Sequence, residues 1–140
     1  MVLAEQKLEK NKELTMLIYV LYGISVFFVL PFFIAIMINY IKREEVKGTF
    51  LESHFDWQIN TFWYTLLWSV LGFITLLVGV GFVILIIDAI WFIYRIVKGI
   101  LYLNDEKRMR PTEVNLWFFV VGFIICTFVA GIFWLFFSFF

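Results

Sequence analysis

Residues 61–103 form the long apolar stretch that decides the fold, TFWYTLLWSVLGFITLLVGVGFVILIIDAIWFIYRIVKGILYL. As one helix this stretch would be about 64 Å long, roughly twice the thickness of the hydrocarbon core of a bilayer. In one model, Gly79 and Gly81 form a tight turn between two spans at 60–77 and 82–102. In the other, one helix ends near residue 87 and the rest lies flat in the membrane interface.

The composition predicts an integral membrane protein. The chain has 140 residues, of which 64% are hydrophobic and only 16% are charged, whereas soluble domains contain about 45–50% apolar residues. Membrane lipids are therefore expected partners. The formal net charge is zero, which gives no indication of a nucleic-acid partner.

The remaining apolar segments predict two further spans. Residues 15–40 carry no charge and would form a helix of about 39 Å, in which Pro31 introduces a kink. A polar tail at 1–14 precedes them, and a last span is expected at 115–138. The glycine turn then gives an all-α domain at 15–140 with four transmembrane helices, and the interfacial alternative gives three.

The orientation depends on the number of spans. With four spans, the two polar loops share one side and carry most of the Lys and Arg residues, so the positive-inside rule places the loops in the cytoplasm and both termini outside. With three spans the N-terminus is cytoplasmic. Trp57 and Trp63 lie near a segment end, as expected for an aromatic belt at the membrane interface.

A helix start and an inward polar stripe are predicted near residue 50. Thr49 and Glu52 have the spacing of a capping box, in which each side chain binds a free backbone amide at the start of a helix. Polar residues then recur at helical spacing and should share one face that turns inward. They are His54, Gln58, Thr61, Thr65 and Ser69. We interpret the stripe as a packing seam, with a polar groove or a partner contact as the functional alternative.

Two charges lie inside the apolar stretch. An ionisable group within a span costs roughly 2.5–3.5 kcal/mol to insert and is by default a functional hypothesis. Asp88 and Arg95 lie about 10.5 Å apart along a helix, too far for a direct ion pair unless the arginine reaches back. We expect Asp88 to be tied to another helix, or to take part in transport or partner recognition.

The last span contains a pattern of small residues. Gly122, Cys126 and Ala130 recur every four residues, which allows two helices to approach closely. Cys126 is the only cysteine, which excludes an intrachain disulfide and a cysteine-based metal site. The neighbour at this pattern is either another helix of the chain or a second copy of it.

The central segment resembles a family of bacterial small membrane proteins of unknown function that are related to the homologues of Tic Twenty. The resemblance covers roughly residues 19–110. It is carried by Glu52, Ser53, His54, Trp57, Gln58, Thr61, Tyr94, Arg95, Lys98 and Gly99. It implies a four-helix domain in the bacterial inner membrane and no activity; the span expected after Arg110 is an addition to the family's pattern.

No catalytic motif is recognisable, and we expect neither an enzyme nor a cofactor. The sequence lacks a nucleophile elbow, a phosphate loop and a dinucleotide fingerprint, and a single histidine makes a poor metal site. The first hypothesis is an accessory or assembly subunit that binds other membrane proteins or itself. The alternatives are a small channel or transporter with a polar path through Asp88, Arg95 and the His54 stripe, and an immunity or stress protein of the membrane.

Overall fold

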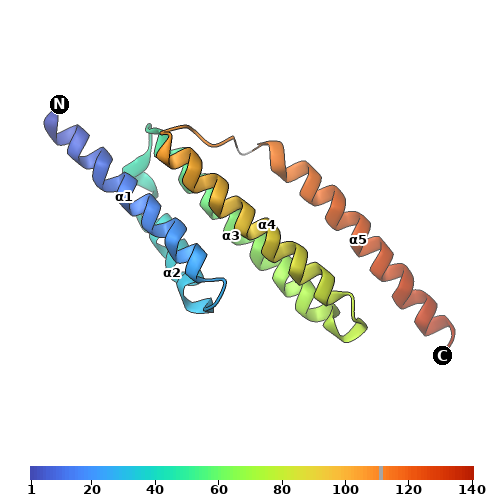
Figure 1. Ribbon diagram of the computed structural model, residues 1–140. Helices are drawn as coiled ribbons and strands as arrows, with labels where there is room; N and C mark the ends of the chain where they lie inside the picture. The colour runs from blue at the N-terminus through green and yellow to red at the C-terminus, as the bar shows by residue number, and fades with distance from the viewer. Residues whose placement is uncertain (111) are drawn as a thin grey trace.

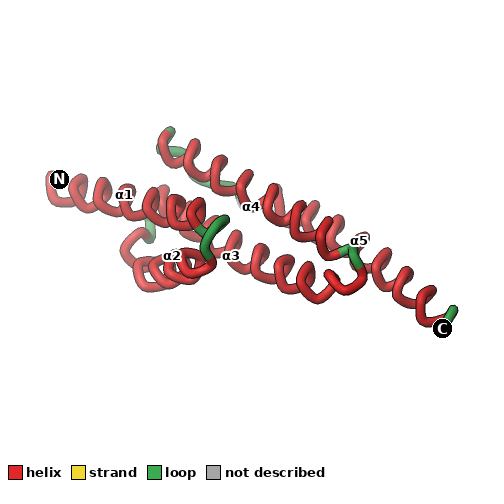
Figure 2. Tube along the Cα trace, turned by 60° about the horizontal axis from the view of Figure 1, so that its bottom comes forward, coloured by secondary structure: helices red, strands yellow, loops and turns green. Residues whose placement is uncertain are grey.

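The chain is all-helical throughout the part that the structure describes (Figure 1). The computed structural model describes the backbone of residues 1–110 and 112–140, and their side chains except those of residues 112–119, 126, 129 and 130. Its elements are α1 (Val2–Ile24), α2 (Val29–Lys42), η1 (Arg43–Val46), α3 (Phe50–Thr75), η2 (Leu76–Val78), α4 (Gly81–Asn104) and α5 (Thr112–Ser138). Figures 1 and 2 show that the long helices run along a common direction.

The predicted first span at 15–40 is wrong as a single helix. Helix α1 ends at Ile24 and α2 runs back beside it, so the two form a helical hairpin (Figure 1). The turn is supported by the Ser25 hydroxyl, which donates to the carbonyl of Tyr22 at 2.6 Å, and by Phe28, whose backbone is extended. The polar tail at 1–14 is the first part of α1.

The kink predicted at Pro31 is also absent. Pro31 is the third residue of α2, and in the first turn of a helix a backbone N–H has no intrahelical acceptor. The missing N–H of proline therefore breaks no hydrogen bond there, and its fixed φ suits the start of the helix. Pro31 helps to begin α2 after the turn instead of bending a longer helix.

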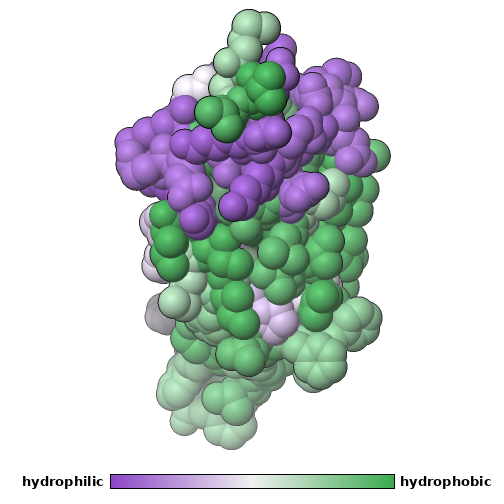
Figure 3. Space-filling model, turned by 90° about the vertical axis from the view of Figure 1, so that its left-hand side faces the viewer, coloured by the Kyte–Doolittle hydropathy of each residue, from purple (hydrophilic) through white to green (hydrophobic). Residues whose placement is uncertain are grey.

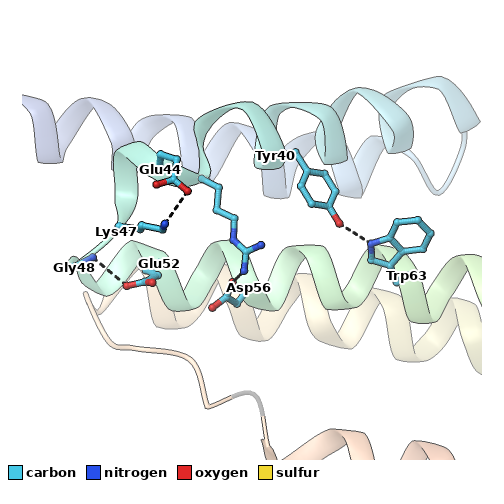
Figure 4. Close-up of polar contacts among 8 residues, drawn as sticks. Tyr40, Glu44, Lys47, Gly48, Glu52, Asp56 and Trp63 are labelled. Atoms are coloured by element: carbon cyan, nitrogen blue, oxygen red, sulfur yellow. Dashed lines mark hydrogen bonds and ion pairs between the residues drawn. The ribbon is translucent and has the colours of Figure 1, made fainter.

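Helix α3 begins where the sequence predicts, but its capping differs by one residue. Thr49 is the N-cap of α3, and its hydroxyl donates backwards to the carbonyl of Val46 at 2.6 Å. The Glu52 carboxylate accepts from the backbone N–H of Gly48 at 3.0 Å (Figure 4). The reciprocal box is therefore not formed, because the Thr49 side chain is bound within the preceding turn.

The glycine turn predicted between α3 and α4 is present. Gly79 has a φ of +83°, a left-handed conformation that favours glycine. Gly81, the first residue of α4, lies so close to the Gly72 carbonyl that an added Cβ would overlap it. Residues 61–103 thus form most of a helical hairpin that contains the turn expected in the first of the two models.

The first four helices pack around a cluster of aromatic rings. The rings of Phe32 and Phe62 are stacked with their centroids 4.4 Å apart, and Tyr22 and Phe92 pack edge-on against Phe32. Each of these four rings comes from a different helix. The cluster therefore joins the α1–α2 hairpin to the α3–α4 hairpin.

Charged groups gather at one end of the molecule, above a hydrophobic surface (Figure 3). The N-terminus lies at the same end as η1 and the loop after α4, and the C-terminus lies at the other end (Figure 1). Lys12 pairs there with Glu106 at 2.7 Å, and this hydrogen bond raises the pKa of Lys12. The four-span model places the N-terminus on the side opposite to the polar loops. The structure differs, because the α1–α2 hairpin brings the N-terminus to the same end as these loops (Figure 1).

Helix α5 stands beside the α3–α4 hairpin and touches it at Gly122. That glycine is buried, and an added Cβ would overlap the Trp68 ring of α3. The side chains of Cys126 and Ala130 lie outside the described residues. Phe123, Phe128 and Trp134 are each more than 70% exposed.

By length and composition, one helical segment of the described residues, Phe50–Val78, is suited to cross a membrane. Its side chains at the start are buried in the bundle, and those beyond Phe62 are mostly exposed or half-buried. An apolar surface of this kind fits a lipid environment.

Gly99→Ala tests the packing of α1 on α4. The Tyr19 ring lies against Gly99, where an added Cβ would overlap it, so we expect the free energy of unfolding in mild detergent to fall by about 1–3 kcal/mol. Gly23→Ala is the matched control, because nothing lies within 4 Å of its added Cβ and alanine favours a helix. Equal stability of the two variants would contradict the close approach of α1 and α4.

Candidate functional site

The polar stripe predicted on α3 is buried in the bundle at its start and half-buried at its end. His54 and Gln58 are fully buried and Thr61 is nearly so, whereas Thr65 and Ser69 are half-buried. The first three contact α1 or α4, and Ser69 contacts α4. The helical spacing in the sequence therefore located residues that the fold brings to a common interior.

His54 connects α3 to α1 and to the loop after α4. Its Nε2 lies 2.9 Å from the carbonyl oxygen of Lys107, and its Nδ1 lies 2.8 Å from the hydroxyl of Tyr19. Because a carbonyl only accepts, Nε2 carries the proton of the neutral ring and Nδ1 accepts from Tyr19. Both ring nitrogens are thus used in bonds that hold three segments together.

Gln58 lies one turn further along α3 and connects α3 to α1. Its side-chain Nε2 donates to the backbone carbonyl of Thr15 at 3.2 Å, and the hydroxyl of Tyr22 donates to the backbone carbonyl of Gln58 at 3.2 Å. Asn39 of α2 donates to the same Tyr22 hydroxyl at 3.5 Å. These bonds connect the α1–α2 hairpin to α3 just beside the aromatic cluster.

Arg95 is 1% exposed and binds α3 through its guanidinium group. Nε donates to the Thr61 hydroxyl at 2.6 Å and Nη2 donates to the Trp57 carbonyl at 3.0 Å. The guanidinium also lies over the Trp57 ring, with Cζ 3.5 Å from the ring centroid. In return the Trp57 indole N–H donates to the Arg95 carbonyl at 3.1 Å, so these two residues fix α3 and α4 to each other.

The position of Trp57 therefore differs from the one that the sequence predicts. It was expected in the aromatic belt at the membrane interface, but it is 1% exposed and lies in the core. Trp63 does lie on the surface, where its indole donates to the Tyr40 hydroxyl at 2.9 Å (Figure 4). The difference arises because a flat aromatic ring is also the best partner for a buried guanidinium.

Asp88 and Arg95 are not bonded to each other. The Oδ2 atom of Asp88 accepts from the Ser69 hydroxyl at 2.8 Å, so the expected tie runs to a member of the polar stripe. Its Oδ1 atom is buried without a hydrogen-bond partner among the described residues. The two charged residues thus have separate hydrogen-bond partners, and each keeps one buried polar atom, Asp88 Oδ1 and Arg95 Nη1, without a partner among the described residues.

A matching polar stripe on α1 was missed in the sequence. Asn11, Thr15, Tyr19 and Tyr22 are all buried, and each makes a hydrogen bond within the bundle. Their spacings of four, four and three residues place them on one helix face. The rule that predicts the stripe on α3 also applies to this face, but its first residue, Asn11, lies in the segment predicted to be a polar tail.

The hydrogen bonds of the polar core run between neighbouring helices. Both ring nitrogens of His54 form hydrogen bonds, and its partner Tyr19 is 1% exposed and lies deep in the bundle. Within the described part of the chain, no three His, Cys, Asp or Glu side chains are grouped as ligands for a metal ion. The buried groups are positioned to bind neighbouring helices.

Tyr19→Phe tests whether the His54 network stabilises the fold. The change leaves Nδ1 of His54 as a buried acceptor without a donor, so we expect a loss of about 1–3 kcal/mol in the free energy of unfolding in detergent. Tyr40→Phe is the control, because its hydroxyl also makes one bond to a ring nitrogen but does so at an exposed position. A loss no larger than that of the control would contradict a stabilising network.

Comparisons with protein-family models, with curated proteins and with solved structures found no match.

Proposed function

We propose that this chain is a membrane-embedded, non-enzymatic accessory or assembly subunit that binds another membrane protein through α5. The observation that carries the proposal is the exposure of α5. This helix has apolar side chains on all sides, and its described contact with its own bundle lies at Gly122. A helix that is apolar all round needs lipid or another helix for its surface.

The distribution of charge supports a membrane location. The polar residues form a band at one end, and the surface below it is hydrophobic (Figure 3). Because α2 has 14 residues, it is about 21 Å long, too short to cross about 30 Å of hydrocarbon. We therefore propose that α3, α4 and α5 cross the membrane, and that the α1–α2 hairpin enters it from the charged side and returns.

The positive-inside rule then orients the molecule. The N-terminal part of α1 and both polar loops carry nearly all Lys and Arg residues, so this end is proposed to be cytoplasmic. The C-terminus would lie on the far side, as in the three-span alternative. The bacterial inner membrane remains a proposal that follows from the resemblance of the segment with Glu52, His54 and Arg95.

One face of α5 offers a surface for a second helix. Thr127 and Gly131 are four residues apart and lie on the opposite side of the helix from Gly122. Gly131 has no atom within 4 Å of an added Cβ, and the Thr127 hydroxyl is bonded to its own helix at Phe123. Small residues at this spacing allow another helix to approach closely in lipid.

The polar core favours this function over a transport path. His54, Gln58 and Arg95 are at most 1% exposed and bind neighbouring helices. A path for ions or solutes would need these groups to face water or an open cavity. Their hydrogen bonds instead hold the neighbouring helices together as a rigid support for α5.

Gly131→Leu tests the proposed contact. The larger side chain keeps α5 helical and apolar but blocks close approach, so recovery of crosslinked membrane-protein partners with the tagged full chain should fall at least several-fold. Ile132→Leu is the control, because it changes the neighbouring residue without adding volume. Wild-type protein that returns alone under conditions that preserve known complexes would contradict the proposal, as would equal recovery with both variants.

A further inference from the structure

A groove of about 330 Å³ lies between the end of the α1–α2 hairpin and the α3–α4 hairpin. Its walls are apolar apart from four polar residues, Ser25, Thr65, Ser69 and Asp88. The α3–α4 hairpin extends beyond the turn between α1 and α2 (Figure 1), so the groove opens beneath that turn. Its volume is in the range of small-molecule sites.

Asp88 supplies the groove with a buried acceptor. The residue is 4% exposed and lines the groove, and its Oδ1 atom has no hydrogen-bond partner among the described residues. Thr65, one turn from Ser69 on α3, also lines the groove, and its hydroxyl is buried without a described partner. Two residues of the apolar groove wall therefore each carry a buried oxygen atom that is free to accept a hydrogen bond.

Arg95 does not satisfy this carboxyl group. Its guanidinium donates to Thr61 and Trp57 instead. Gln58 and Asn39 also carry a buried oxygen without a partner, but neither is charged and neither lines the groove. Burial of an uncompensated carboxylate is costly, and a cationic donor in the groove would remove that cost.

We propose that the groove binds an apolar molecule that carries a primary ammonium group. The ammonium donates to Oδ1 of Asp88 and to the Thr65 hydroxyl, and the apolar body lies against Val29, Phe73 and Phe92. The ligand is either a free lipophilic amine or the ethanolamine headgroup of a lipid, because both present the same donor. This inference does not depend on the proposed contact of α5.

A second, smaller cavity offers a competing explanation for the free oxygen. It has a volume of about 20 Å³, lies on the α5 side of Asp88 and is lined also by Trp68 and Gly122. A space of this size can hold one water molecule. If a water molecule in this cavity donates a hydrogen bond to Oδ1, that oxygen no longer lacks a partner, and the groove should bind an amine no more tightly than an alcohol.

Binding to the full chain in phosphatidylcholine nanodiscs separates the two explanations. The ligands are decylamine, decanol and decyltrimethylammonium, compared at equal membrane mole fraction by the concentration dependence of the unfolding temperature. Wild-type protein should bind decylamine at least about tenfold more tightly than decanol, because a hydrogen bond to a charged group contributes about 1.5–3 kcal/mol. Decyltrimethylammonium, which has the charge but no N–H donor, should bind more weakly than decylamine.

Three variants complete the experiment. Asp88→Asn should reduce the preference for decylamine to less than about twofold, whereas Asp56→Asn, which changes an exposed carboxylate paired with Arg43 (Figure 4), should retain it. Ala89→Leu, at an exposed groove position, should weaken the binding of both amine and alcohol. If Asp88→Asn does not fold, the wild-type ligand series and Ala89→Leu decide the question.

The lipid source is tested in the same assay. Phosphatidylethanolamine should compete with decylamine if its headgroup occupies the groove, and should leave the apparent affinity unchanged if the ligand is a free amine. Equal binding of decylamine and decanol by wild-type protein would overturn the proposal. So would an amine preference that persists in Asp88→Asn, or binding of amine and alcohol that is not weakened in Ala89→Leu.

Discussion

The guanidinium group of Arg95, held by Thr61 and Trp57, is the interaction on which the rest of the bundle depends. A charge in an apolar interior is stabilised by hydrogen bonds to its donors and by cover over its face. Nε and Nη2 of Arg95 reach α3 and the Trp57 ring covers the face of the guanidinium, whereas Nη1 is buried without a hydrogen-bond partner among the described residues. Because Trp57 also donates to the carbonyl of Arg95, the register of α3 against α4 is set at this point.

The other polar contacts extend that register to the remaining helices. His54 and Gln58 lie on the same face of α3 as Thr61 and bind Tyr19 and Thr15 of α1. In the proposed membrane setting, the hydrophobic effect does little to favour one helix pairing over another, so hydrogen bonds and close packing determine which helices pair. The buried polar stripes on α1 and α3 determine this pairing, and the aromatic cluster fills the space between the helices.

The sequence predicted those parts of the fold that follow from local spacing. The glycine turn, the start of α3 and the inward face from His54 to Ser69 all depend on residues close together in the chain. The α1–α2 hairpin was missed because residues 15–40 carry no charge and no turn motif stronger than Ser25, so hydropathy and length alone favoured one span. The partners of Trp57, Arg95 and Asp88 could not be predicted, since each lies at least 19 residues away from its partner.

The central claim is that Arg95 and Thr61 stabilise the bundle as a pair, and a double-mutant cycle measures this directly. The free energy of unfolding in mild detergent would be determined for the wild type, Thr61→Val, Arg95→Met and the double variant. The account predicts a coupling energy of about 1–3 kcal/mol between the two positions. Effects that add to within about 0.5 kcal/mol would contradict it.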